Sequence, residues 1–229
     1  MQAQTTYYVR AWVCWHLSDG VSQITYGPQL VFTTASAVSE GVLTGGHPAV
    51  DMGTGLLWSV CNIGAQRPEE TGDFYAWGEV MPKQTFTMEN YYWYSNDLFT
   101  KYNTADGIKR LQPSDDAAVC QWQQGWRMPT VAEFEALISN SVCTPISVNG
   151  VQGVRLTSKS TGQTLFMPAA GCSFDSSNPQ TVYFWTSELS SMYEAVSYVL
   201  PRDYVNSQCA SLSFTRESGL SVRAVHELP

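Results

Sequence analysis

Histidine and carboxylate side chains are the groups in this chain that could carry acid–base or nucleophilic chemistry. The three histidines are His16, His47 and His226, and they fall in different parts of the sequence. Serine-type catalysis needs a nucleophile, a histidine and an orienting acid within hydrogen-bonding distance. The sequence has no G-x-S-x-G and no H-E-x-x-H motif, and no glycine-rich phosphate loop begins a predicted helix. We therefore expect neither a serine hydrolase nor a zinc hydrolase.

Paired carboxylates could instead support glycoside hydrolysis, in which one acid donates a proton and a second carboxylate acts as base or nucleophile. The candidates are Asp73, Glu79, Asp115, Asp116, Glu133 and Glu135. Asp115 and Asp116 stand at the start of a predicted helix, where the helix dipole favours anions, and Glu133 closes a predicted capping box. Glu79 is the candidate for which the sequence suggests no structural task. A carboxylate-based glycan hydrolase therefore stays open as a weaker alternative.

Cysteine spacing gives no sign of a metal centre. The six cysteines are Cys14, Cys61, Cys120, Cys143, Cys172 and Cys209. No C-x-x-C pair occurs, so neither a structural zinc site nor a thioredoxin-type centre is expected. We expect most of these cysteines to be buried thiols that act as small hydrophobic residues, and disulfides remain possible.

Composition limits the classes of protein that this chain can be. Of its 229 residues, 44% are hydrophobic, 13% aromatic and 14% charged, and the net charge is -8. The aromatic content excludes disorder, and the acidic balance argues against a nucleic-acid partner. No apolar run approaches the roughly 20 residues of a membrane helix.

The same composition bears on location. Few charges and many aromatic and small polar residues favour an extracellular or outer-membrane surface module rich in β-structure. Residues 1–4 do not begin a signal peptide. We therefore expect a fragment, or a chain that has lost its export segment.

The first part of the chain predicts a hairpin. Two β-rich runs, residues 6–13 and 30–34, flank a turn-rich stretch with Asp19-Gly20. The strand "YYVRA" followed by a strand ending in "FTT" resembles the last two strands of a fibronectin type III or other immunoglobulin-like sandwich. We therefore divide the chain into residues 1–34, a remnant of such a domain, residues 35–48, a linker, and residues 49–229, a complete domain.

The pattern after residue 48 predicts strands, two helices and then more strands. Thr130 and Glu133 form a capping box at the start of the second helix, residues 129–138, and Ser114 is the predicted N-cap of the first, residues 113–122. Residues 81–112 form a long irregular insertion rich in aromatics. The predicted strands are residues 49–53, 56–62, 151–157, 163–167, 183–187, 195–200, 210–215 and 220–225. This order predicts an α+β fold with segregated helices.

Two segments, "GWRMPTVAEFEAL" and "SGLSVRAV", carry a family resemblance. It is supported in the same order along the chain by "VDMGTGLLWSVCNIGAQRPEETGDFYAWGEV", "NGVQGVRLTSKSTGQTLFMPAAG" and "FWTSEL". Residues 49–226 resemble the Fibrobacter succinogenes major paralogous domain, which is abundant in surface proteins of Bacteroidetes and their relatives. The resemblance implies a C-type lectin-like domain, with two helices plus an antiparallel sheet, in a cell-surface or fimbrial adhesion protein.

The resemblance also sets expectations about cofactors. Formylglycine-generating relatives bind copper through two nearby cysteines, but Cys209 has no second cysteine a few residues away. Sugar-binding C-type lectins hold calcium through Glu-Pro-Asn or Gln-Pro-Asp and Trp-Asn-Asp, and none of these occurs. The nearest approach, residues 175–179, predicts an Asx turn. We therefore expect no metal and no cofactor.

In this fold, ligands meet the loops around the late strands, so the resemblance implies a binding site there. The predicted ligand-binding residues of these loops are Asp175, Asn178, Arg202, Asp203, Tyr204, Asn206 and Gln208. Tyr91 and Trp93 could add an aromatic wall, although Tyr92 and Trp93 could equally cover the core. Four tryptophans of the family-like motifs are assigned to the core: Trp58, Trp77, Trp126 and Trp185.

The sequence therefore predicts a non-catalytic extracellular recognition module that binds glycan or protein through its late-strand loops. A structural or assembly module of a surface appendage is the first alternative, and the glycan hydrolase is the second. We expect no nucleic-acid partner and no transmembrane segment. Ligand identity, disulfide state and oligomeric state stay open.

Overall fold

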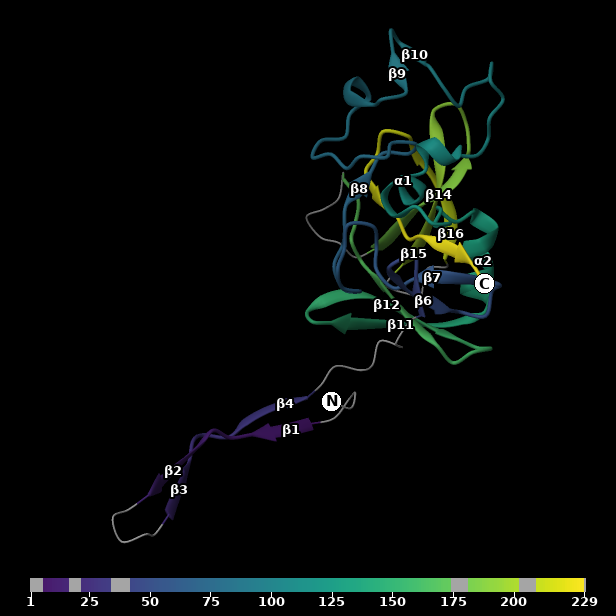
Figure 1. The fold of residues 1–229 in the computed structure, drawn as a ribbon. Helices are drawn as coiled ribbons and strands as arrows, with labels where there is room; N and C mark the ends of the chain where they lie inside the picture. The colour runs from purple at the N-terminus through teal and green to yellow at the C-terminus, as the bar shows by residue number, and fades with distance from the viewer. Residues whose placement is uncertain (1–5, 17–21, 34–41, 174–180, 202–208, 229) are drawn as a thin grey trace. The chain divides into compact units, whose positions relative to one another are not determined.

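The computed structural model describes residues 6–16, 22–33, 42–173, 181–201 and 209–228 (Figure 1). The chain forms two compact units, residues 1–40 and residues 41–229.

The first unit is an antiparallel hairpin, as predicted. Its strands are β1 (Thr6–Val9), β2 (Trp12–His16), β3 (Ser22–Tyr26) and β4 (Leu30–Thr33). β1 pairs with β4 and β2 with β3, and the Gly27 N–H donates to the Ala11 carbonyl between the two pairs. Large apolar side chains on this ribbon, including Tyr8 and Trp12, are exposed. Its origin in an immunoglobulin-like sandwich stays a prediction.

The second unit is built from several sheets. Its strands are β5 (Val42–Thr44), β6 (His47–Asp51), β7 (Leu56–Ser59), β8 (Phe74–Tyr75), β9 (Tyr94–Ser95), β10 (Leu98–Phe99), β11 (Ser141–Val148), β12 (Val151–Ser158), β13 (Thr164–Pro168), β14 (Thr181–Leu189), β15 (Glu194–Pro201), β16 (Ala210–Thr215), β17 (Leu220–Ser221) and β18 (Val225–Glu227). β5 and the beginning of β6 lie within the stretch that was predicted to be a linker.

Strand order shows that the beginning and the end of the second unit share sheets. One sheet has the order β16-β15-β14-β17-β8 and another the order β18-β7-β6-β5. Late strands thus pair with early ones, β18 with β7 and β17 with β8. β11, β12 and β13 form a third sheet, and β12 and β13 confirm the hairpin predicted around Gly162. The β9–β10 hairpin lies at the end of the unit opposite β11 and β12 (Figure 1).

The two predicted helices are present but short. α2 (Val131–Ser139) begins at the predicted capping box, in which Thr130 Oγ1 accepts from the Glu133 N–H and Glu133 Oε2 accepts from the Thr130 N–H. α1 spans Ala117–Trp122, and 3₁₀ turns span Met88–Asn90 and Pro113–Asp115. No described helix is long and apolar enough to cross a membrane.

The predicted cap of α1 was wrong. Asp116, not Ser114, caps this helix, because its Oδ1 accepts from the N–H groups of Ala118 and Val119. At the other end, α1 stops at Gln123, which has a φ of 56°. This left-handed conformation cannot continue a right-handed helix.

The predicted α+β fold of C-type lectin-like type was also wrong, because the chain is mostly β-sheet. Its described α-helices contain six and nine residues, whereas strands run through both units and form several sheets. The sequence pattern located both helices but overestimated the length of the first, which was predicted over residues 113–122 and spans Ala117–Trp122. Strands that the sequence did not predict, namely β3, β5, β8, β9, β10 and β11, raise the β content further.

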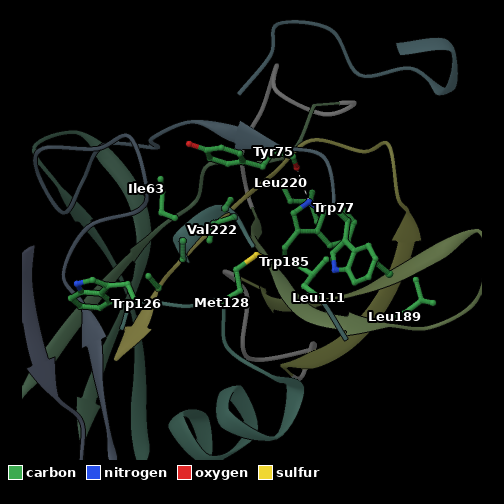
Figure 2. Close-up of a cluster of buried hydrophobic side chains, with 14 of the residues drawn as sticks. Ile63, Tyr75, Trp77, Leu111, Trp126, Met128, Trp185, Leu189, Leu220 and Val222 are labelled. Atoms are coloured by element: carbon green, nitrogen blue, oxygen red, sulfur yellow. Dashed lines mark hydrogen bonds between the residues drawn. The ribbon is translucent and has the colours of Figure 1, made fainter. Parts of the chain in front are cut away.

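Tryptophans occupy the core of the second unit, as predicted. Trp58, Trp77, Trp126 and Trp185 are all buried. In the cluster drawn in Figure 2, the Trp185 indole N–H donates to the Tyr75 carbonyl at 2.7 Å, and the Trp77 indole N–H donates to the Thr186 carbonyl at 2.9 Å. These bonds satisfy polar atoms that burial would otherwise leave without partners.

Four cysteines of the second unit lie in or beside the core, and Cys120 is half-buried on α1. Cys61 and Cys172 are buried, and Cys143 and Cys209 pack against a second core cluster around Phe134. Burial raises the pKa of the Cys61 thiol. Its thiol is therefore protonated at neutral pH and acts as a small apolar group.

Candidate functional site

Most of the predicted ligand-binding residues lie outside the described part of the chain. These are Asp175, Asn178, Arg202, Asp203, Tyr204, Asn206 and Gln208. The late-strand binding site therefore stays a prediction, and so does the turn over residues 175–179.

The two aromatic residues predicted to join the site have different surroundings. The Tyr91 side chain is 2% exposed; its hydroxyl donates to the Trp77 carbonyl at 2.6 Å and accepts from Arg216 Nε at 3.0 Å. Tyr91 therefore belongs to the interior. Trp93 is half-buried and lines a pocket.

This pocket has a volume of about 510 Å³. Its walls come from the 79–93 stretch and from the 3₁₀ turn before α1. The residues that matter for its chemistry are Glu79, Lys83, Tyr92, Trp93, Ser114 and Asp115. We call it the aromatic-loop pocket.

The aromatic side of the pocket has one exposed and one fixed ring. Tyr92 is 72% exposed, and its ring centre lies 4.7 Å from that of Trp93 at an interplanar angle of 87°. The Trp93 indole N–H donates to the Gly78 carbonyl at 2.7 Å. Trp93 also packs against the core, so it both covers the core and lines the pocket, while Tyr92 faces solvent.

Glu79 has a structural role that the sequence did not reveal. Its Oε1 accepts from Lys83 Nζ at 2.9 Å and from the Tyr92 N–H at 2.8 Å, and its Oε2 lies 2.8 Å from Lys83 Nζ. The Glu79 carboxylate thus links Lys83 to Tyr92, the two ends of the stretch of residues 83–92. Lys83 in turn donates to the Asn90 carbonyl at 3.1 Å.

Asp115 forms the second acidic group of the pocket. Its Oδ2 accepts from Lys101 Nζ at 2.5 Å and from the Tyr102 hydroxyl, and its Oδ1 accepts from the Ser114 hydroxyl at 2.8 Å. Burial acts to raise the pKa of Asp115, but the bonds from Lys101, Tyr102 and Ser114 outweigh it, so the pKa is lowered. Asp115 is therefore a carboxylate at neutral pH.

These two carboxylates suit hydrogen-bond acceptance better than proton donation. A glycosidase needs one carboxyl group whose raised pKa keeps it protonated. The lowered pKa of Asp115 opposes that role, and both oxygens of Glu79 are engaged by Lys83. The remaining lone pairs of the Glu79 and Asp115 carboxylates can accept hydrogen bonds from the hydroxyl or amide groups of a ligand.

The other candidate carboxylates lie elsewhere. Asp116 caps α1, and Glu135 is exposed on α2. Glu133 accepts from Arg127 at 2.6 and 2.9 Å as well as closing its capping box. Asp73 lines a different pocket. The structure therefore brings together only Glu79 and Asp115 of the predicted set at the aromatic-loop pocket.

Two of the three histidines lie against the same tryptophan although they are far apart in sequence. The rings of His47 and His226 both lie against Trp126, with ring centres 6.2 and 5.4 Å away. The His16 side chain lies outside the described atoms. Within the described residues, no group of three or more His, Cys, Asp or Glu side chains is placed to hold a metal ion.

Sequence reasoning missed the lysines that organise the pocket. Lys83 neutralises Glu79, and Lys101 binds Asp115 while its ammonium lies 5.0 Å from the Trp93 ring centre. The spacing of Glu79 and Lys83 is that of an ion pair on a helix, but no helix forms there. No local sequence pattern predicts the ion pair between Lys101 and Asp115.

Comparisons of the chain with family models, with curated proteins and with solved structures found no match. The resemblance to the Fibrobacter succinogenes major paralogous domain therefore stays a prediction.

Proposed function

We propose that the protein is a non-catalytic recognition module that binds carbohydrate in the aromatic-loop pocket. One observation carries this proposal: an exposed tyrosine and a fixed tryptophan line the same pocket as two carboxylates. Aromatic rings and a few placed polar groups are the usual components of a small-ligand site.

The chemistry of a sugar matches these components. A pyranose ring has apolar C–H faces that pack on aromatic rings, and its hydroxyls donate hydrogen bonds to carboxylates. Tyr92 and Trp93 offer large contact area at a low cost in side-chain entropy. The bonds that Glu79 makes to Lys83 and Tyr92 fix the loop before a ligand arrives, which reduces the ordering cost of binding.

We also propose that the module belongs to a cell-surface or secreted protein. The low fraction of charged residues and the many aromatic and small polar residues support this location. The resemblance to a family of surface proteins supports it too. Binding through the late-strand loops would add to the pocket and remains a separate prediction.

A glycan array probed with the intact chain tests the proposal, followed by calorimetric titration of the best ligand. Tyr92→Ala removes an exposed ring without disturbing the core, and we expect it to weaken binding by about tenfold or more, because truncating a central aromatic contact costs over 1 kcal/mol. Tyr8→Ala, at a similarly exposed tyrosine of the first unit, is the matched control. Absence of any glycan ligand, or equal binding by both variants, would contradict the proposal.

Glycan hydrolysis is the second candidate function, because two carboxylates line one pocket. It requires that a bound glycan be cleaved. Incubating the best array ligand with the protein and measuring new reducing ends decides between the two functions. We expect none. Cleavage that Glu79→Gln abolishes would establish the hydrolase instead.

A further inference from the structure

A second pocket, of about 470 Å³, lies apart from the aromatic-loop pocket and shares no lining residue with it. Its walls are the turn before β6, the loop of residues 61–66, the beginning of β8 and the end of α1. The residues that carry the argument are His47, Gly64, Asp73, Tyr75, Gln121 and Trp122. We call it the Tyr75 pocket.

The Tyr75 hydroxyl is the first feature of this pocket that points to a ligand. The Tyr75 side chain is 2% exposed, and its ring packs in the core with Trp77 and Trp185. Figure 2 shows the hydroxyl on the side of the ring that faces away from Trp77. Among the described residues, this hydroxyl has no hydrogen-bond partner. Burial raises its pKa far above the usual value, so it remains a proton donor.

Asp73 adds a carboxylate to the lining of the same pocket, and its negative charge adds to the raised pKa of Tyr75. The Asp73 N–H donates to the Ile63 carbonyl at 2.9 Å, which fixes the backbone. In the described part of the chain, the Asp73 carboxylate has neither an ion pair nor a hydrogen bond. Asp73 is exposed, and it lines the pocket.

Gly64 makes room for this carboxylate. Its φ of +84° favours glycine, and a Cβ at this position would lie 2.3 Å from Asp73 Oδ2. Any side chain at residue 64 would therefore displace the carboxylate. The absence of a side chain at Gly64 thus allows the Asp73 carboxylate its position in the pocket wall.

The remaining wall is aromatic and uncharged. His47 stacks on Trp122 with ring centres 3.9 Å apart and an interplanar angle of 14°. Burial lowers the pKa of His47, so its imidazole is neutral at pH 7. Cys61 also lines the pocket, and its thiol is protonated because burial raises its pKa. Asp73 is thus the charged group among the described lining residues.

We propose that the Tyr75 pocket binds an organic cation, namely a protonated amine. The ammonium group would pair with the Asp73 carboxylate and lie beside the Trp122 ring, which attracts cations through its quadrupole. The lone pair of the Tyr75 hydroxyl or the Gln121 amide oxygen would accept a further N–H. An amino sugar and a lysine side chain of a peptide both supply this chemistry.

Titration followed by NMR tests the proposal on the intact chain. The probes are D-glucosamine and N-acetyl-lysine methylamide as cations, with glucose and N-acetylglucosamine as neutral counterparts. We expect at least one cation to shift the resonances of Tyr75 and Trp122, and its affinity to fall as salt rises, because screening weakens charge pairing. Glucosamine binding alone identifies an amino sugar, and lysine-probe binding alone identifies a peptide. Failure of both cations overturns the proposal.

Variants separate this pocket from the aromatic-loop pocket. Asp73→Asn should weaken cation binding by about tenfold or more, since a charge-assisted hydrogen bond is lost, while Asp97→Asn removes the same charge from an exposed residue that does not line this pocket and should not. Tyr75→Phe keeps the packed ring and should weaken binding less. Equal binding by neutral probes, or binding that survives Asp73→Asn, overturns the proposal. Loss of binding in Tyr92→Ala would also overturn it by assigning the cation to the other pocket.

Discussion

The guanidinium carbon of Arg216 lies 4.6 Å from the centre of the Phe99 ring, in the interior of the second unit. Three further rings, those of Trp77, Tyr91 and Tyr102, lie within 6 Å. The guanidinium donates to the Tyr91 hydroxyl and to the carbonyls of Lys101, Tyr102 and Met192. A buried cation thus holds the segment that carries Trp93, which lines the aromatic-loop pocket.

Replacing this arginine should destabilise the protein strongly. Arg216→Met leaves several buried acceptors without donors and removes the cation from the aromatic rings, so we expect the free energy of unfolding to fall by about 2–4 kcal/mol. Chemical denaturation measures the change. Arg67→Met is the control, because the Arg67 side chain is 68% exposed, and it should stay within about 0.5 kcal/mol of the parent. A stable Arg216→Met variant would show that the charge is dispensable.

Local patterns predicted the parts of the fold that local energetics determine. The Thr130–Glu133 capping box located α2, and turn residues located the β12–β13 hairpin. The four core tryptophans were also correct, since large aromatic rings bury the most apolar area. The capping box and the hairpin depend on neighbours in sequence, and the burial of the tryptophans follows from the size of their rings.

Long-range pairing explains what the sequence did not reveal. β18 pairs with β7 and β17 with β8 across most of the second unit, and no local periodicity encodes such partners. The burial of Arg216 and Arg223 was likewise unexpected, because arginine is usually exposed. Their acceptors are mostly backbone carbonyls, which carry no residue signature.

The candidate site was predictable only in part, because it too combines residues that are neighbours in sequence with residues that are distant in sequence. The aromatic run predicted Tyr91 and Trp93 as an aromatic wall, and Trp93 does line a pocket. Tyr91 is buried instead, and its neighbour Tyr92 lines the pocket. Asp115, which lines the same pocket, belongs to the 3₁₀ turn Pro113–Asp115, and tertiary packing places that turn beside the aromatic residues. The sequence therefore indicated the aromatic wall but not the acidic one.

Phe134 should be the residue of α2 that contributes most to stability. Its buried ring lies parallel to that of Tyr198, with ring centres 5.0 Å apart, and tilted against that of Trp58 at 5.1 Å. Phe134→Ala should lower the free energy of unfolding by about 3–5 kcal/mol, through lost burial and a cavity. Leu98→Ala, at an exposed position, should change it little. Similar denaturation midpoints for the two variants would refute the assignment.

Glu133 should make stability depend on pH. Burial acts to raise the pKa of Glu133, but the bonds from Arg127 and Thr130 outweigh it, so its pKa is lowered in the folded state. A lowered carboxyl pKa stabilises the fold above the unfolded pKa of about 4.3, and this contribution is lost as pH falls through the folded value. Glu133→Gln should therefore cost about 1 kcal/mol at pH 7 and progressively less towards pH 3.

The measurement is the free energy of unfolding of parent and variant at several pH values from neutral to acidic. Glu135→Gln, at an exposed position on the same helix, is the control and should follow the parent profile. A difference between Glu133→Gln and the parent that stays constant with pH would mean that the ion pair with Arg127 does not titrate in this range.

The second unit should fold without the hairpin. Among the described residues, its buried clusters are drawn from residues 49–225. A chain of residues 41–229 keeps all of these residues, so we expect it to unfold cooperatively within a few degrees of the full chain in differential scanning calorimetry. A control that also deletes residues 42–51 removes β5 and β6 from the sheet and should not fold. If residues 41–229 fail to give a cooperative transition, the hairpin must contribute contacts on which the larger unit depends.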